Sequence, residues 1–306
     1  MTTASRLSRY LDPKVLASMA ALEIKARNVV EGFIEGLHKS PFKGFNVEFS
    51  EYRQYVPGDP LKDIDWKIYA RTDKYYIKEH EEETNLSGYL IMDTSGSMSY
   101  RGGNAPLSKL DYAATLAASL AYLMLKQQDS VGLVTFADGV RKILRPRTGM
   151  AQLKAICSEL EQTKPTDRTD IGDTLDRVAE TMRKRGLLII FSDLLDNTEL
   201  IINKVRQLRT RRHEVLLFHI LDHHELTFPF EDTTLFRDLE DRSEIIADAF
   251  SLRREYLRRM QQFVGAFQSA LRKSGIDYLL ADTSRPVEAS LKSFFTRRQA
   301  VGARLA

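Results

Sequence analysis

From about residue 85 onward, short apolar runs alternate with longer segments that carry apolar residues every three or four positions. The first pattern is typical of buried strands and the second of amphipathic helices. Strands are predicted at 88–92, 130–136, 140–144, 186–191, 214–220 and 277–281. Helices are predicted at 109–127, 150–162, 171–184, 199–212 and 252–274. This alternation predicts an α/β fold with a doubly wound, mostly parallel sheet.

Two local signals refine this fold. The tripeptide Ala137-Asp138-Gly139 separates two of the predicted strands by a short turn, which favours one antiparallel hairpin in the sheet. The helix at 109–127 carries Ala113, Ala114, Ala117 and Ala121 along one stripe. Small side chains on that stripe predict that the helix packs closely against the sheet.

The first 84 residues follow a different rhythm. A helical pattern over 13–36 precedes strand-like segments at 45–56 and 75–79, and Pro57-Gly58-Asp59-Pro60 marks a turn between them. We therefore expect a small N-terminal α+β element at 1–84, with a helix and a few antiparallel strands. The α/β domain with its C-terminal helices then occupies 85–306.

Composition and charge narrow the classes of function. The chain has 45 basic and 42 acidic residues and a net charge of +3, so its overall charge gives no argument for nucleic acid binding. No aromatic platform accompanies the basic run Arg206–Arg212. No apolar run approaches the about 18 residues of a membrane span, and Cys157 is the single cysteine. A cytoplasmic protein without a membrane span is the resulting expectation.

Side chains with oxygen atoms gather in three loops that follow predicted strands or precede a helix. They are Asp93-Thr-Ser95-Gly-Ser97, Thr169-Asp170 and Ser192-Asp193. In an open α/β sheet, ligands collect at the carboxyl ends of the strands. Carboxylates and hydroxyls are hard ligands that suit Mg²⁺ or Mn²⁺. Together the three loops predict one metal site.

Each of these residues also has a simpler interpretation when it is taken alone. Ser95 and Ser97 are typical of turns and helix caps, Thr169 could cap the following helix, and Asp193 could be a solvated loop carboxylate. The order in which Asp93, Ser95, Ser97, Thr169 and Asp193 occur together favours the metal site over these separate roles. The histidines near residue 219 lack the spacing of a zinc site, and His219 is interpreted as a hydrogen-bonded core residue.

The order Asp-x-Ser-x-Ser, then Thr before a helix, then Asp after a buried strand resembles the metal-ion-dependent adhesion site of von Willebrand factor A domains. The N-terminal part, with Phe49-Ser-Glu-Tyr-Arg-Gln-Tyr-Val-Pro-Gly-Asp-Pro60, Asp63-Ile-Asp-Trp66 and Ala70-Arg71, resembles the bacterial family called domain of unknown function 58. Members of that family carry such an A-like domain and are typically encoded beside MoxR-type AAA+ ATPases.

The resemblance implies that Asp93, Ser95, Ser97, Thr169 and Asp193 hold Mg²⁺, with Mn²⁺ or Ca²⁺ as alternatives. It also implies that an acidic residue of a protein partner completes the coordination. Two positions depart from the pattern, because Arg168 and Leu194 stand where many A domains have glycine. The sequence leaves open whether the Arg168 charge displaces the metal.

Three functions are open for this chain. The resemblance to the family implies the first, a metal-dependent protein-binding adaptor that works with a MoxR-type AAA+ ATPase in complex assembly or maturation. The chain has no Gly-x-x-x-x-Gly-Lys-Ser/Thr loop, so ATP hydrolysis is expected in a partner and the chain is not expected to be an enzyme. The alternatives are a metal-dependent hydrolase, either phosphatase or nuclease, and a scaffold whose metal site is empty.

Overall fold

The computed structural model describes residues 52–56, 64, 66–78, 87–103, 105–165, 171–181, 186–211 and 213–302. These residues fall into two compact units, one within Ser40–Asn85 and the other in the part of the chain from Leu86 onward. The helix predicted at 13–36 lies outside the described residues.

The smaller unit contains a two-stranded sheet and one helix. Strand β1 (Tyr52–Gln54) pairs antiparallel with β2 (Tyr76–Lys78), and α3 (Trp66–Thr72) lies between them in sequence. The rings of Tyr69 and Tyr75 stack with centroids 4.5 Å apart, which ties the helix to the start of β2. Strands β1 and β2 overlap the strand-like segments predicted at 45–56 and 75–79, whereas α3 is a helix that the sequence analysis does not predict.

A six-stranded sheet forms the centre of the larger unit. Its strands are β3 (Ser87–Asp93), β4 (Ser130–Phe136), β5 (Val140–Arg147), β6 (Leu187–Ser192), β7 (Glu214–Leu221) and β10 (Asp277–Asp282). They lie in the order β10-β7-β6-β3-β4-β5. All pairs are parallel except β4 with β5, which form the antiparallel hairpin expected at residues 137–139. The predicted doubly wound α/β class is therefore confirmed.

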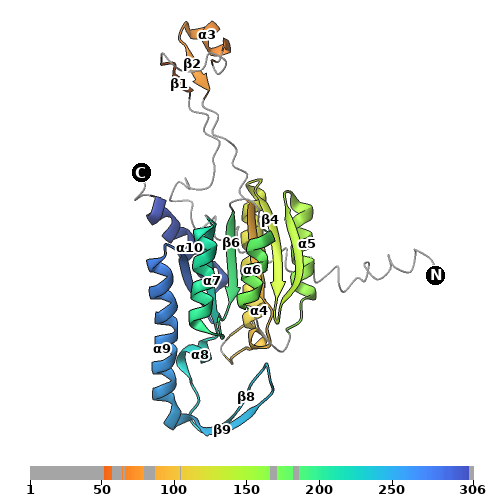
Figure 1. The fold of residues 1–306 in the computed structure, drawn as a ribbon, viewed down its shortest axis with the longest axis vertical. Coiled ribbons are helices and arrows are strands. Elements are labelled where there is room, and N and C mark those ends of the chain that lie inside the picture. The colour runs from red at the N-terminus through yellow and green to blue at the C-terminus, as the bar shows by residue number, and fades with distance from the viewer. Residues whose placement is uncertain are drawn as a thin grey trace, which may run out of the picture. The chain divides into compact units, whose positions relative to one another are not determined.

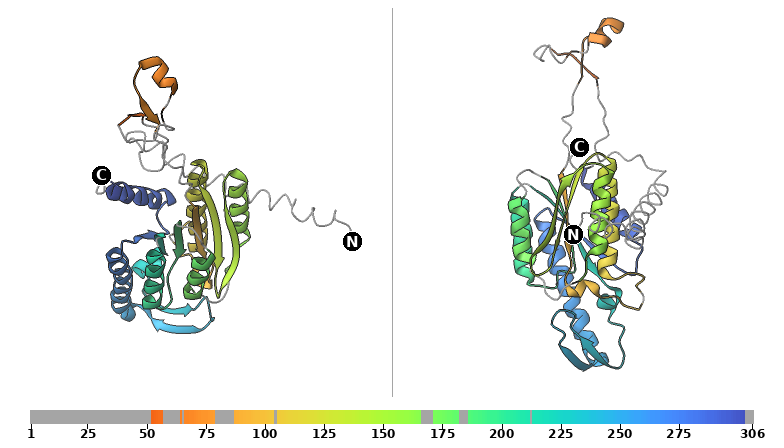
Figure 2. Two further views of the ribbon diagram at one scale, coloured as in Figure 1. Left: turned by 45° about the horizontal axis from the view of Figure 1, so that its top comes forward. Right: turned by 90° about the vertical axis from the view of Figure 1, so that its right-hand side faces the viewer.

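Helices cover both faces of this sheet (Figures 1 and 2). Helices α4 (Lys109–Lys126), α5 (Met150–Gln162) and α10 (Val287–Gly302) pack on one face. Helices α6 (Ile171–Thr181), α7 (Thr198–Thr210) and α9 (Ala249–Lys273) pack on the other. The short α8 (His223–Thr227) follows β7 directly. Because the near-continuous apolar strands are covered on both faces, their side chains are buried in two layers of core.

The alanine stripe of α4 does bring this helix close to the sheet. Ala113, Ala117 and Ala121 have no exposed surface. The approach also explains a glycine in β3, because a Cβ on Gly88 would lie 2.4 Å from the Cε atom of Met124 in α4. Small residues on both elements therefore set the distance between helix and sheet.

The antiparallel strand β5 forms one edge of the sheet and differs in character from its neighbours. Most of its side chains are exposed or half-buried, whereas β4 beside it is buried along almost its whole length. Its sequence is Val140-Arg-Lys-Ile-Leu-Arg-Pro-Arg147. The edge is thus basic and contains a proline near its end.

A second hairpin is an addition that the sequence patterns do not predict, and α10 is a C-terminal helix for which they give no bounds. Strands β8 (Thr233–Arg237) and β9 (Glu244–Asp248) pair antiparallel between α8 and α9. The hairpin projects beyond the end of the sheet where α8 lies (Figure 1). Phe236 anchors it by stacking on Phe228 with ring centroids 5.7 Å apart. Within the described residues, no helix is long and apolar enough to cross a bilayer.

Candidate metal centre

The candidate site lies where the winding of the sheet reverses direction. Strands β3 and β6 are neighbours in space although six elements separate them in sequence, and the helices that follow them, α4 and α7, lie on opposite faces of the sheet. Such a switch point is where open α/β sheets bind ligands, beyond the carboxyl ends of the strands. Asp93 ends β3, and Asp193 follows Ser192 at the end of β6.

The loop after β3 brings two hydroxyls together. Ser95 precedes a turn of 3₁₀ helix, η2 (Gly96–Ser99), and its Oγ atom lies 3.1 Å from Oγ of Ser97. Thr94 anchors the loop to β4, since its backbone N–H and its hydroxyl both donate to the Phe136 carbonyl, at 2.8 and 2.6 Å. The two serine hydroxyls are therefore held at one place by the neighbouring strand.

Asp93 is a fully buried carboxylate. Its two oxygens accept hydrogen bonds from the Ser95 backbone N–H at 3.0 Å and from the Ser192 hydroxyl at 2.6 Å. Burial, together with the nearby Asp193 carboxylate, raises the pKa of Asp93 to about 7 despite these bonds. In the part of the chain that the structure describes, no lysine or arginine pairs with Asp93. The carboxylate thus lies where a cation would stabilise its charged form.

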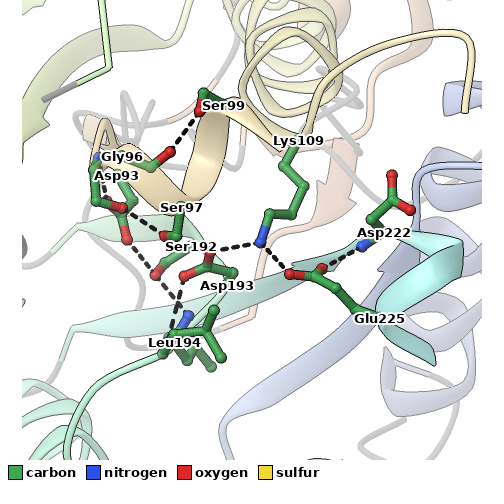
Figure 3. A network of polar contacts seen from close by, with 12 residues as sticks. Asp93, Gly96, Ser97, Ser99, Lys109, Ser192, Asp193, Leu194, Asp222 and Glu225 are labelled. Carbon is green, nitrogen blue, oxygen red and sulfur yellow. Dashed lines mark hydrogen bonds and ion pairs between the residues drawn. The ribbon is translucent and has the colours of Figure 1, made fainter. Parts of the chain in front are cut away.

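Asp193 is buried as well, but it has a cationic partner (Figure 3). The ammonium group of Lys109, which has no exposed surface, lies 2.7 Å from its Oδ2 atom. The Oδ1 atom accepts the Leu195 backbone N–H at 3.3 Å. Burial alone would raise the pKa of Asp193, but the Lys109 charge and hydrogen bond hold it below its usual range. Asp193 is therefore ionised in the structure.

Lys109 joins the site to the short helix α8. Its Nζ atom lies 2.6 Å from Oε1 of Glu225, whose Oε2 accepts the Asp222 backbone N–H at 2.7 Å. That bond is half of a capping box at the start of α8. Burial would lower the pKa of Lys109, but the two carboxylates raise it above its ordinary value. One buried ammonium thus bridges the carboxylate after β6 and the carboxylate in α8.

Leu194, which stands where many A domains have glycine, has a backbone conformation that favours glycine. Its φ is 57°, in the left-handed region that glycine adopts without steric cost and in which a bulky side chain causes strain. The side chain is buried in the core, and the backbone N–H donates to the Ser192 hydroxyl at 2.9 Å. The loop therefore keeps the glycine-like turn without glycine, and packing and this hydrogen bond hold the strained residue.

His219 supports the same loop from the core, as the sequence interpretation expects. Its Nε2 atom lies 2.9 Å from the Asp193 carbonyl oxygen, and Nδ1 lies 2.7 Å from the Tyr278 hydroxyl. Since a carbonyl only accepts, Nε2 carries the proton and Nδ1 accepts from Tyr278. Burial lowers the pKa of His219 to about 4. The ring is a neutral structural support for the Asp193 loop.

Of the five predicted ligands, the structure brings Asp93, Ser95, Ser97 and Asp193 together. Thr169 and the neighbouring Arg168 lie outside the described residues, so their predicted roles stay predictions. The sequence analysis misses Lys109 and Glu225. A lysine at the first position of a mostly apolar helix was the available signal, because a cation is unfavourable at a helix N-terminus unless it has a partner.

The four described residues fit a hard divalent ion. Ligands at 2.0–2.1 Å from an octahedral Mg²⁺ lie about 2.9 Å apart on adjacent vertices, whereas the longer bonds to Ca²⁺ give about 3.4 Å. The serine hydroxyls are hydrogen-bonded to each other at 3.1 Å, which is close enough for both to be neighbouring ligands of such an ion. The charges also fit: a bound cation favours the ionised form of Asp93, whose pKa is otherwise raised to about 7, and with all three carboxyls ionised Asp93, Asp193 and Glu225 outnumber the single Lys109 ammonium by two. A divalent cation would balance that excess.

The strand order, the antiparallel edge strand and the Asp-x-Ser-x-Ser loop at the switch point define a von Willebrand factor A-like domain. The chain belongs to the family described as "Protein of unknown function DUF58", whose model matches residues 51–263. The matched residues include parts of both described units.

The chain is also similar to several known proteins and solved structures. The uncharacterized proteins Mb1516 of Mycobacterium bovis and Rv1480 of Mycobacterium tuberculosis are each 27% identical over 296 residues, covering 94% of this chain and 91% of theirs. Among solved structures, BatB of Bacteroides thetaiotaomicron is 16% identical with a TM-score of 0.46, covering 70% of this chain and 99% of its own. The SpRpn10 VWA domain is 12% identical with a TM-score of 0.40, covering 67% and 93%. The strand order, and not these distant structural likenesses, carries the fold assignment.

Proposed function

We propose that this chain is a metal-dependent protein-binding module. Asp93, Ser95, Ser97 and Asp193, with Thr169, would hold Mg²⁺, or alternatively Mn²⁺ or Ca²⁺. The observation that carries the proposal is the pair of serine hydroxyls 3.1 Å apart between two buried carboxylates at the switch point of the sheet. When bound, the ion would offer an open coordination position to a carboxylate of a protein partner.

The described residues divide the work of such a site. The serine hydroxyls would be the direct ligands, because both carboxylates already accept at least two hydrogen bonds or ion pairs from the protein. Each carboxylate keeps lone pairs that can bind an ordered water of the ion. The Thr94 and His219 contacts position the two loops, and the strained Leu194 turn fixes the direction of Asp193.

We further propose that the partner is a MoxR-type AAA+ ATPase, or a client of one, and that the chain acts as its adaptor in the cytoplasm. Family membership supports this proposal, and the sequence contains no Gly-x-x-x-x-Gly-Lys-Ser/Thr loop, so we assign ATP hydrolysis to the partner. The chain itself is proposed as a binding module and not as an enzyme. Both ring nitrogens of His219 are engaged in structural hydrogen bonds, so this nearby histidine does not serve as a general base.

The metal site is tested by thermal unfolding with EDTA and with excess Mg²⁺. Ligand at about 100 times its dissociation constant stabilises the folded state by about 2.7 kcal/mol, so the wild type should unfold at a higher temperature in Mg²⁺. Asp93→Asn should lose this shift. The matched control Asp138→Asn, at a solvent-exposed carboxylate, should keep it. An equal shift in Asp93→Asn and wild type would exclude Asp93 from the site.

The partner is tested separately with the purified MoxR-type ATPase of the same genome. Size-exclusion chromatography should show a complex in Mg²⁺ that dissociates in EDTA and does not form with Asp93→Asn. A complex that survives EDTA would contradict metal-bridged binding while leaving the adaptor role intact.

One observation favours a second function, a scaffold with an empty metal site. The Lys109 ammonium already provides Asp193 with a positive charge in a direct ion pair. If divalent ions leave the unfolding temperature of the wild type unchanged and the protein does not bind Mn²⁺, the scaffold is supported and the metal-dependent proposal fails.

A further inference from the structure

The candidate site contains a buried positive charge of its own, the ammonium group of Lys109. Lys109 is the first residue of α4 and has no exposed surface, yet it carries a charge beside the candidate ligands. Its Nζ atom lies 2.7 Å from Asp193 and 2.6 Å from Glu225. Burying an ammonium is costly unless it is well paired, so these two contacts fix its position.

We propose that Lys109 is the countercharge of the site: it weakens the binding of a bare divalent ion and tunes the loaded site to accept an anionic ligand. This inference rests on the proposed function, because it concerns the same Asp193 that would help to hold the ion. Lys109 acts through Asp193 and Glu225, so it is a positioning residue for the site.

The charges of the named side chains support this role. When a bound cation keeps all three carboxyls ionised, Asp93, Asp193 and Glu225 bring three negative charges, and Lys109, which is paired with the last two, brings one positive charge. With a divalent ion added, these four side chains and the ion sum to zero. Without Lys109 the same site would keep one negative charge and would repel an incoming carboxylate. The ammonium and the ion are also like charges within one buried cluster, so each weakens the binding of the other.

Coulomb's law therefore gives two substitutions effects of opposite sign on metal affinity. Lys109→Met removes a repelling charge and frees Asp193, so Mn²⁺ should bind at least about tenfold more tightly. Glu225→Gln removes an attracting charge and leaves the ammonium in place, so Mn²⁺ should bind more weakly. A purely structural role for the Lys109 bridge would weaken Mn²⁺ binding in both variants, because both break it.

Mn²⁺ binding to the full chain is measured by electron paramagnetic resonance of the free ion. The matched control is Lys126→Met, which removes the same charge from an exposed position in the last turn of α4, about 25 Å along the helix. Its affinity should equal that of the wild type. Lys109→Arg keeps the charge and should restore an affinity near the wild-type value, which separates charge from side-chain packing.

The preference for an anion is measured by repeating the titrations with acetate in place of chloride at equal ionic strength. Acetate should tighten Mn²⁺ binding to the wild type and should have a smaller effect on Lys109→Met. If wild type binds Mn²⁺ and Lys109→Met binds it equally or more weakly, or if acetate affects both alike, this inference fails and the proposed function stands. If neither protein binds Mn²⁺, both fail.

Discussion

The Nζ atom of Lys109 lies 2.7 Å from Oδ2 of Asp193, which joins the first residue of α4 to the loop after β6. The two side chains are 0% and 2% exposed, so water does little to screen their charges. Lys109 and Asp193 come from different elements that meet at the carboxyl ends of the central strands. The ion pair therefore stabilises the fold and shapes the candidate site at once.

Breaking this pair should destabilise the protein strongly. Removing one member of a buried ion pair leaves the other charge buried and unpaired, so Lys109→Met should lower the free energy of unfolding by about 3–5 kcal/mol in EDTA. Chemical denaturation measures this loss. Lys126→Met should change the value by no more than about 0.5 kcal/mol. A loss of similar size in both variants would show that the buried pair contributes nothing special.

Asp282 should make the stability depend on pH in the acid range. Burial alone would raise its pKa, but hydrogen bonds from His223 at 3.0 Å and from Ser284 hold the pKa below its usual value. A lowered folded-state pKa stabilises the protein above the unfolded value of about 3.9, and the contribution is lost as the pH falls through the folded pKa. Asp282→Asn should thus be less stable than wild type at neutral pH.

The stability difference between wild type and Asp282→Asn should shrink below about pH 4, where the unfolded carboxyl is protonated. Urea unfolding at several pH values measures it. Asp277→Asn, at the other end of β10, is the matched control. A difference that stays constant from neutral to acid pH would contradict the assignment to Asp282.

Gly132 of β4 should not tolerate a side chain. A Cβ at this position would lie 2.6 Å from the Leu144 carbonyl oxygen in β5, a backbone atom that cannot move without disturbing the hairpin. Gly132→Ala should therefore cost about 1–3 kcal/mol in stability. Gly139→Ala, in the turn of the same hairpin with open space around the new Cβ, should be close to neutral. Thermal unfolding compares the two, and equal effects would argue against the close contact.

The two faces of the β8–β9 hairpin should respond differently to substitution. Phe236 contacts the rings of Phe228 and Phe230, so Phe236→Ala should cost about 2 kcal/mol, less than for a fully buried ring. Ile246 is 73% exposed, and Ile246→Thr keeps the branched Cβ, so its stability should match the wild type. Hydrogen exchange of residues 233–248 should quicken only in Phe236→Ala. Faster exchange in both would mean that the exposed face also anchors the hairpin.

The sequence predicts the central fold well because each strand and helix there has a clear period. The predicted strand at 130–136 and helix at 150–162 agree with β4 and α5 residue by residue. The β8–β9 hairpin was missed because Leu235 and Ile246, a cross-strand pair, are both largely exposed. An element that places apolar side chains in solvent lacks the apolar and polar alternation that identifies a half-buried strand.

Part of the candidate site was predictable for a similar reason. Asp93, Ser95, Ser97 and Asp193 lie at or just after the ends of buried strands. The carboxyl ends of parallel strands lie at the same end of a sheet. Lys109 of α4 and Glu225 of α8 lie beside the same strand ends. They are 116 positions apart, and no spacing pattern in the sequence links them. Only the packing of the two helices brings their charges together.

The basic strand β5 has a consequence for how the molecule behaves among its own copies. A sheet edge carries unpaired backbone groups that can pair with a strand of another molecule. Here two molecules that approached edge to edge would bring Arg141, Lys142, Arg145 and Arg147 against the same residues, and Pro146 has no N–H to donate. Mutual repulsion and a missing donor thus protect this side of the sheet from strand-to-strand aggregation, and charge-neutral replacements along β5 would open it.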